Sequence, residues 1–262
     1  MVIGQPVPIT QGSSPANRPD LSPDGEWLVF SSQEVKEGHI FIIRRDGTGR
    51  RQLTEGVSRE QNPRWSPDGS RIAFFSNRSG RDEFWIINAD GSGLRQLTYM
   101  LRSPGLWPVC VWSPDGKRLA YSTLDRNACF IMEVGKTWQE QTPQALPPAS
   151  NGYRVVSWSP DGRKLAGFGK RSGIVVYSLE SQQYEQLTDF GAAPVWLSDN
   201  RRLLFTRGSK TKFCLVDSQS KKVHEILSVA PHGSSAVTLS RDDRQIYFTL
   251  RTIEQDIWLM SR

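Results

Sequence analysis

A polar turn centred on an aspartate recurs six times along the chain, each time between two apolar runs. Full copies of Ser-Pro-Asp-Gly occupy residues 22–25, 66–69, 113–116 and 159–162, and degenerate copies surround Asp199 and Asp242. From one aspartate to the next, the spacings are 44, 47, 46, 38 and 43 residues. Repeats of this length, each with several short strands, are typical of propeller blades. We therefore predict an all-β, six-bladed β-propeller built from four-stranded antiparallel blades.

The second repeat shows the predicted strands of one blade. They cover residues 62–66, 71–76, 83–88 and 94–98. The turn between the first two strands combines proline, which fixes φ, with an aspartate that can bond its own backbone and a glycine that tolerates positive φ. A tryptophan three residues before the aspartate recurs as Trp65, Trp112, Trp158 and Trp196. We expect the aspartates to stabilise the turns and these tryptophans to lie in the core between blades.

The two ends of the chain complement each other. The sixth repeat provides three strands and then stops at Arg262, whereas the first repeat is preceded by a surplus segment, residues 7–12. Ile9 lies 15 residues before Asp24, as Leu53 lies 15 before Asp68. The segment therefore occupies the place of an outer strand. We expect it to complete blade 6, which removes a free sheet edge and makes residues 1–262 a single closed domain.

Composition narrows the class of protein further. The formal net charge of +6 is dispersed rather than gathered into a basic tract, so we expect no nucleic-acid partner. No apolar run is long enough to span a membrane, and no signal peptide is visible.

Three scattered cysteines give neither a disulfide framework nor a metal-ligand spacing. We expect a cytoplasmic monomer with reduced thiols; a periplasmic location is the alternative if a leader has been removed.

Residues 62–98 and 109–134 resemble the WD40-like PD40 repeats of TolB-type six-bladed propellers. The resemblance covers essentially the whole chain and weakens around Asp199 and Asp242, where the proline and glycine of the turn are lost. It implies the propeller fold. TolB proteins also carry an N-terminal α/β domain and a signal peptide, and this sequence shows neither. The resemblance therefore does not extend to an envelope function.

The sequence offers no convincing catalytic or metal site. There is no Gly-x-Ser-x-Gly nucleophile motif. His39, His224 and His232 fall in separate blades without a matching carboxylate pattern, and we expect them to be exposed or in turns. The turn aspartates also lie on separate blades, which excludes shared metal ligation. We therefore expect no catalytic residues, no metal and no cofactor.

Loops that join an outer strand to the next inner strand share one face with the loops between second and third strands. They carry more basic than acidic residues, which favours an acidic partner. Two of these loops, residues 99–107 and 150–154, also hold aromatic side chains outside the repeated register, and exposed aromatic and arginine side chains are typical interface anchors. A tryptophan in such a loop can instead cover its own blade. The candidate binding residues on this face are Trp107, Tyr153, Arg102, Arg154, Arg126 and His232.

Asp20 and Arg64 hold equivalent positions in adjacent blades, and we expect them to pair at the central channel. The prediction that follows is a non-catalytic protein-recognition or scaffold module that binds its partner on the loop face at the channel mouth. The alternative is a sensor domain for a small ligand or carbohydrate within a larger regulatory protein. A propeller hydrolase or lyase ranks third.

Overall fold

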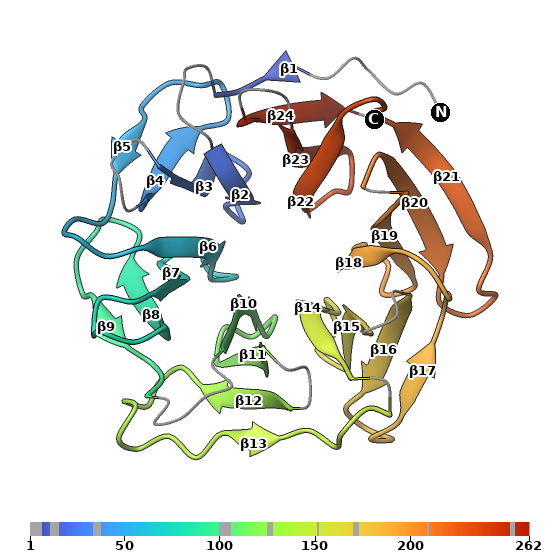
Figure 1. Ribbon diagram of the computed structural model, residues 1–262, viewed down its shortest axis with the longest axis horizontal. Coiled ribbons are helices and arrows are strands. Elements are labelled where there is room, and N and C mark those ends of the chain that lie inside the picture. The colour runs from blue at the N-terminus through green and yellow to red at the C-terminus, as the bar shows by residue number, and fades with distance from the viewer. Residues whose placement is uncertain are drawn as a thin grey trace. The chain divides into compact units, whose positions relative to one another are not determined.

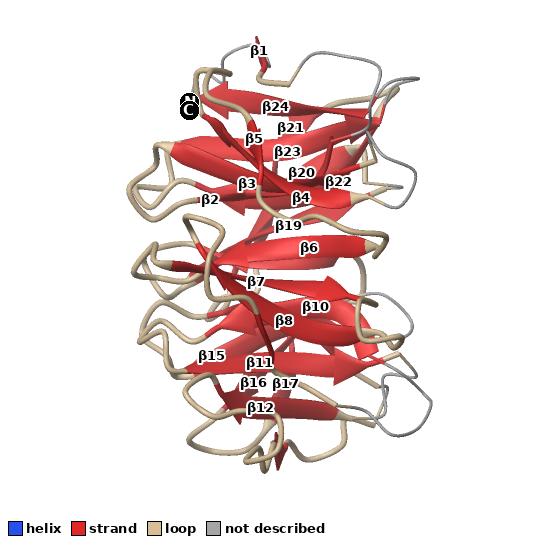
Figure 2. Ribbon diagram, turned by 90° about the vertical axis from the view of Figure 1, so that its left-hand side faces the viewer, coloured by secondary structure: helices blue, strands red, loops and turns tan. Residues whose placement is uncertain are grey.

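The computed structural model describes residues 7–10, 16–33, 38–99, 106–124, 128–150, 152–169, 173–208, 210–251 and 255–261. These residues form strands and loops without a helix (Figure 2), so none of them provides a helix that could cross a bilayer. The strands form six four-stranded antiparallel sheets, which confirms the predicted six-bladed propeller. The chain divides into two compact units, Met1–Leu101 with His232–Arg262 and Arg102–Pro231.

The first unit contains three blades, labelled in Figure 1. Blade 1 consists of β2 (Ala16–Leu21), β3 (Trp27–Ser32), β4 (His39–Arg44) and β5 (Arg51–Gln52). Blade 2 consists of β6 (Glu60–Trp65), β7 (Arg71–Ser76), β8 (Glu83–Asn88) and β9 (Arg95–Gln96). Blade 6 consists of β22 (Gly233–Leu239), β23 (Gln245–Arg251), β24 (Gln255–Ser261) and β1 (Val7–Pro8).

The second unit contains the other three blades. Blade 3 consists of β10 (Leu106–Trp112), β11 (Arg118–Thr123), β12 (Cys129–Glu133) and β13 (Gln144–Ala145). Blade 4 consists of β14 (Arg154–Trp158), β15 (Lys164–Phe168), β16 (Ile174–Ser178) and β17 (Tyr184–Gln186). Blade 5 consists of β18 (Ala192–Trp196), β19 (Arg202–Arg207), β20 (Lys212–Asp217) and β21 (Val223–Ser228).

The N-terminal segment completes blade 6, as predicted. Strand β1 pairs antiparallel with β24, the third strand of that blade, and the two lie side by side in Figure 1. The Ile9 N–H donates to the Ile257 carbonyl at 2.8 Å, and the Ile257 N–H donates to Thr10 Oγ1 at 2.8 Å. The Phe84 N–H makes the same bond to Thr98 Oγ1 within blade 2. Ile9 and Thr10 therefore fill the place of a regular outer strand.

The turn aspartates stabilise their own turns, which confirms the role predicted for them. In blade 2, Asp68 Oδ1 accepts the Ser66 hydroxyl at 2.5 Å and the Ser70 N–H at 3.1 Å. Ser66 Oγ in turn accepts the Arg71 N–H at 2.9 Å, which joins the turn to the start of β7. The same serine-to-aspartate bond holds the turns of Asp24, Asp115, Asp161 and Asp242.

The repeated tryptophans lie in the core, also as predicted. Trp65, Trp112, Trp158 and Trp196 are all buried. In the first unit, Trp65 of blade 2 belongs to one cluster with Val29 and Ile40 of blade 1 and with Ile72 and Phe74 of its own blade. Blades 1 and 2 are therefore joined by a continuous apolar core.

Candidate functional site

Two loops of blades 1 and 2 are bonded to each other at one end of the sheets. The Arg59 N–H donates to Asn77 Oδ1 at 2.7 Å, and the Asn77 N–H donates to the Arg59 carbonyl at 3.3 Å. The Arg59 guanidinium lies 3.3 Å from the Asp82 carboxylate. With Tyr99, three residues beyond the end of β9, these loops form a surface that we call the blade 2 loop surface. It comprises residues 55–59, 77–82 and 99.

Apolar side chains protrude from this surface. Val57 is 91% exposed, and Tyr99 is 42% exposed. The Arg81 guanidinium lies 5.6 Å from the centroid of the Tyr99 ring. Arginine and tyrosine are residue types that anchor protein interfaces, and the exposed Val57 adds apolar contact area to the same surface.

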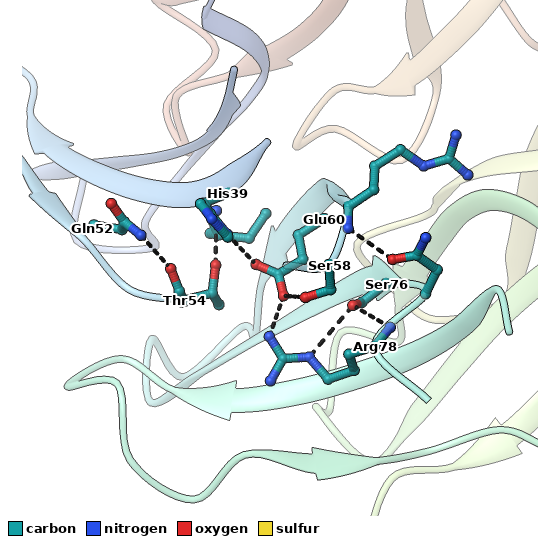
Figure 3. A network of polar contacts seen from close by, with 10 residues as sticks. His39, Gln52, Thr54, Ser58, Glu60, Ser76 and Arg78 are labelled. Carbon is teal, nitrogen blue, oxygen red and sulfur yellow. Dashed lines mark hydrogen bonds and ion pairs between the residues drawn. The ribbon is translucent and has the colours of Figure 1, made fainter. Parts of the chain in front are cut away.

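A buried carboxylate holds both loops from beneath. Figure 3 shows Glu60 at the centre of a polar network, with its carboxylate directed toward His39, Ser58 and Arg78. Its Oε2 lies 3.3 Å from His39 Nδ1, and its Oε1 accepts the Ser58 hydroxyl at 2.9 Å and an Arg78 N–H. Glu60 is 1% exposed. A buried charge is tolerated when it is paired and hydrogen-bonded in this way.

Arg78 connects the network to the core of blade 2. Its guanidinium lies 5.4 Å from the ring centroid of Trp85 and 5.8 Å from that of Phe74. Ser58 belongs to one loop of the surface and Arg78 to the other, so Glu60 joins both loops through a single buried group. The exposed side chains are consequently presented on loops that are positioned in advance, which lowers the entropy cost of binding.

The predicted pair of Asp20 and Arg64 is present, with 3.7 Å between the guanidinium and the carboxylate. Asp20 also accepts the Trp65 N–H at 2.8 Å and the Thr238 hydroxyl at 3.3 Å. Burial raises the pKa of the Asp20 carboxyl, and Arg64 opposes that rise. Asp20 thereby connects the inner strands β2, β6 and β22 of the first unit, which indicates a structural role.

Tyr153 requires a correction. We expected an exposed aromatic side chain in a long loop, but Tyr153 is 1% exposed and belongs to a core cluster with Cys129 and Val155. The chain turns at Gly152, where φ is +65°, and the tyrosine then packs with its ring centroid 5.2 Å from that of Tyr184. It cannot serve as a surface anchor in this conformation.

The remaining predicted binding residues are not brought together by the described part of the structure. Arg102 and Arg126 lie outside the described residues. Trp107 falls in strand β10, and its side chain is not described. Arg154 begins β14 and donates to the Leu124 carbonyl at 3.0 Å. His232 is exposed in a bend before β22.

His39 also requires a correction, because sequence reasoning missed its carboxylate partner. His224 and His232 are exposed, as expected, whereas His39 is 3% exposed and is paired with Glu60. The two residues are 21 positions apart and begin strands in different blades. The signal available in the sequence was one of position, because each residue is the first of a strand that follows a loop.

Neither a metal site nor a disulfide emerges from the described residues. No group of three or more His, Cys, Asp or Glu side chains able to hold a metal ion occurs among them. The three cysteines, Cys110, Cys129 and Cys214, are buried and do not form disulfides with one another.

Fold and repeats together define a β-propeller built from Ser-Pro-Asp-Gly turn repeats. The PD40 family model, described as the TolB beta propeller domain, matches residues 5–146. The chain belongs to this family. No curated protein matches its sequence.

Solved structures resemble the chain in fold. TolB from Acinetobacter baumannii matches with a TM-score of 0.72 and 15% identity, covering 92% of this chain and 65% of the TolB chain. A TolB candidate from Agrobacterium tumefaciens matches with a TM-score of 0.63 and 18% identity, covering 95% and 81%. An oligogalacturonate lyase from Vibrio parahaemolyticus matches with a TM-score of 0.67 and 10% identity, covering 98% and 93%. The chain thus spans about two thirds of the length of the Acinetobacter TolB. At these identities the likeness shows the fold alone.

Proposed function

We propose that this protein is a non-catalytic recognition module that holds a partner protein on the blade 2 loop surface. The observation that carries the proposal is the combination of an almost fully exposed Val57 with the buried Glu60 network that positions its loop. An exposed apolar side chain on a mobile loop has little meaning, whereas one on a positioned loop supplies contact area at a low ordering cost.

The partner that fits is a protein segment with apolar side chains and a carboxylate. Apolar side chains of the segment would cover Val57 and the ring of Tyr99, and its carboxylate would reach the exposed Arg81 at the rim. A rim charge of this kind acts mainly on the association rate and its salt dependence. This refines the expectation of an acidic partner and moves the aromatic anchor from Tyr153 to Tyr99.

The test is affinity capture from native lysate, followed by binding measurements with the purified partner. A Val57→Glu, Tyr99→Glu double variant is compared with wild type at low and high salt. Leu94→Glu is the matched control, because Leu94 is 40% exposed in the β8–β9 turn of the same blade. We expect the double variant to weaken binding at least about tenfold, corresponding to about 1.4 kcal/mol. The control should bind as wild type does.

Binding that survives the double variant would contradict the proposed surface. Capture that yields no specific partner would favour the alternative, a sensor domain for a small ligand or carbohydrate. The hydrolase or lyase alternative has no described catalytic constellation in its support, and the lyase named among the similar structures shares only the fold.

A further inference from the structure

Blade 1 departs from the other blades at the residue that begins its second strand. This residue stands three positions after the turn aspartate. In the other blades it is a polar, mostly basic residue: Arg71, Arg118, Lys164, Arg202 and Gln245. In blade 1 it is Trp27.

The second unit shows what a basic residue does at this position. The guanidinium of Arg118, from blade 3, lies 5.2 Å from the ring centroid of Trp158, the repeated tryptophan of blade 4. A guanidinium over an indole is attracted to the negative face of the ring. In this blade pair the protein supplies its own cation for the repeated tryptophan.

Between blades 1 and 2 this internal cation is replaced by a cavity. Trp27 and Trp65 both line it, and its volume is about 410 Å³. Among the residues that the structure describes, the cation over the Trp27 ring is Arg44, 5.1 Å from the ring centroid, and no arginine or lysine lies over the Trp65 ring. Arg44 is not among the residues that line the cavity. An aromatic-lined space therefore stands where blades 3 and 4 have an arginine.

The cavity is also negatively charged. Asp24, Asp68 and Asp90 line it together with a single basic residue, Arg51, whose guanidinium donates to the Ala89 carbonyl at 2.8 Å. Three carboxylates and one guanidinium leave two negative charges. Hydrogen bonds, chiefly from the Ser66 hydroxyl, lower the pKa of Asp68 to about 2, and the Ser22 hydroxyl is the main cause that lowers the pKa of Asp24. Both carboxylates are therefore ionised at neutral pH.

We propose that this cavity is a binding site for a guanidinium group, supplied either by a small arginine-like molecule or by an arginine side chain of a peptide. A planar guanidinium can stack on an indole while its N–H groups bond carboxylates, which an ammonium group cannot do with the same geometry. The site is separate from the blade 2 loop surface, because none of its lining residues belongs to that surface.

The test is an NMR titration of the wild-type chain, following the Gly69 amide and the Trp27 indole N–H. The probes are N-acetyl-argininamide and its uncharged isostere N-acetyl-citrullinamide. Trp27→Arg places in the protein the cation that Arg118 provides elsewhere, and it should weaken argininamide binding at least tenfold. Asp24→Asn keeps an oxygen that can accept the turn bonds and should weaken binding about threefold. Thermal unfolding establishes that both variants are folded.

Argininamide binding that is lost with citrullinamide and in the Trp27→Arg variant would support the site. Equal binding of the two probes, or wild-type affinity in a folded Trp27→Arg variant, would overturn it. A second pair of probes, acetyl-Ala-Ala-Arg-Ala-Ala-amide and its citrulline analogue, identifies the source of the group. Tighter binding of the arginine peptide than of argininamide assigns the site to a side chain of a partner, and equal binding assigns it to a small molecule.

Discussion

Glu60 and Tyr153 are both buried, but only one of them has hydrogen-bond partners for its polar group. Glu60 is buried with three partners, and each partner also belongs to a loop or strand end that the carboxylate holds in place. Tyr153 is equally buried, but its hydroxyl has no hydrogen-bond partner within the described structure. A polar group that is buried without a partner loses its hydration, and no hydrogen bond offsets that cost in free energy. The two residues should therefore respond differently to removal of the polar group.

We expect Tyr153→Phe to leave the stability unchanged or to raise it by about 1 kcal/mol, because the variant removes an unpaired hydroxyl and keeps the packed ring. Tyr184→Phe is the matched control in the same aromatic cluster. Its hydroxyl donates to the Pro147 carbonyl at 2.7 Å, and its loss should cost about 1 kcal/mol. Chemical denaturation measures both. A Tyr153→Phe variant as destabilised as Tyr184→Phe would show that the Tyr153 hydroxyl has a partner after all.

At the scale of one element, the hydrogen bonds of the turn explain why serine and aspartate recur at the same two positions. The serine hydroxyl both donates to the aspartate and accepts the first N–H of the following strand, so one side chain links the turn to the sheet. In blade 5 the serine position is Leu197, and Arg202 bonds the Asp199 carboxylate instead. In this degenerate copy the turn aspartate is therefore still fixed by a side-chain donor, but the donor is an arginine instead of a serine.

Ser66→Ala should destabilise the protein by about 1–2 kcal/mol, because it leaves the Arg71 N–H without its acceptor. The effect should depend on pH. The Ser66 bond is the largest of the interactions, including the bonds from Ser70 and the nearby Arg71, that lower the pKa of Asp68 from 3.8 to about 2. The folded protein therefore binds this proton less readily than the unfolded chain does. The associated stability is present above about pH 4 and is lost as the pH falls toward 2.

The measurement is urea denaturation of wild type and Ser66→Ala between pH 7 and pH 2. The stability difference between them should shrink across the lower part of this range. Ser181→Ala, in an exposed turn, is the control and should change little at any pH. A difference that stays constant down to pH 2 would contradict the role assigned to the Asp68 charge.

The elements that sequence reasoning predicted well are those set by local chemistry. The turn motif located all six blades, and the 15-residue offset of Ile9 from Asp24 located the closing strand, because both follow from a spacing that repeats along the chain. The burial of Tyr153 and the pairing of His39 with Glu60 depend on contacts between separate strands and blades. Loop length and residue type do not report such contacts, so the candidate surface had to be moved within the loop face.

At the scale of the whole molecule, the first and last strands of the chain belong to one blade. Ile9 is 8% exposed and shares a core cluster with Tyr247 and Ile257 of blade 6 and with Leu28 and Phe30 of blade 1. The N-terminal segment therefore does more than add a strand. It covers the edge of β24 and also contributes to the core that joins blade 6 to blade 1.

Deleting residues 1–10 should consequently lower the stability by at least about 3 kcal/mol, from the lost burial of Ile9 and the lost bonds to β24. For a chain of this size, that corresponds to a fall in Tm of roughly 6–12 °C. Deleting only residues 1–6 is the control, because strand β1 begins at Val7. The exposed edge of β24 should also promote self-association, which light scattering detects. A Tm equal in the two deletions would mean that the N-terminal strand does not close the propeller in solution.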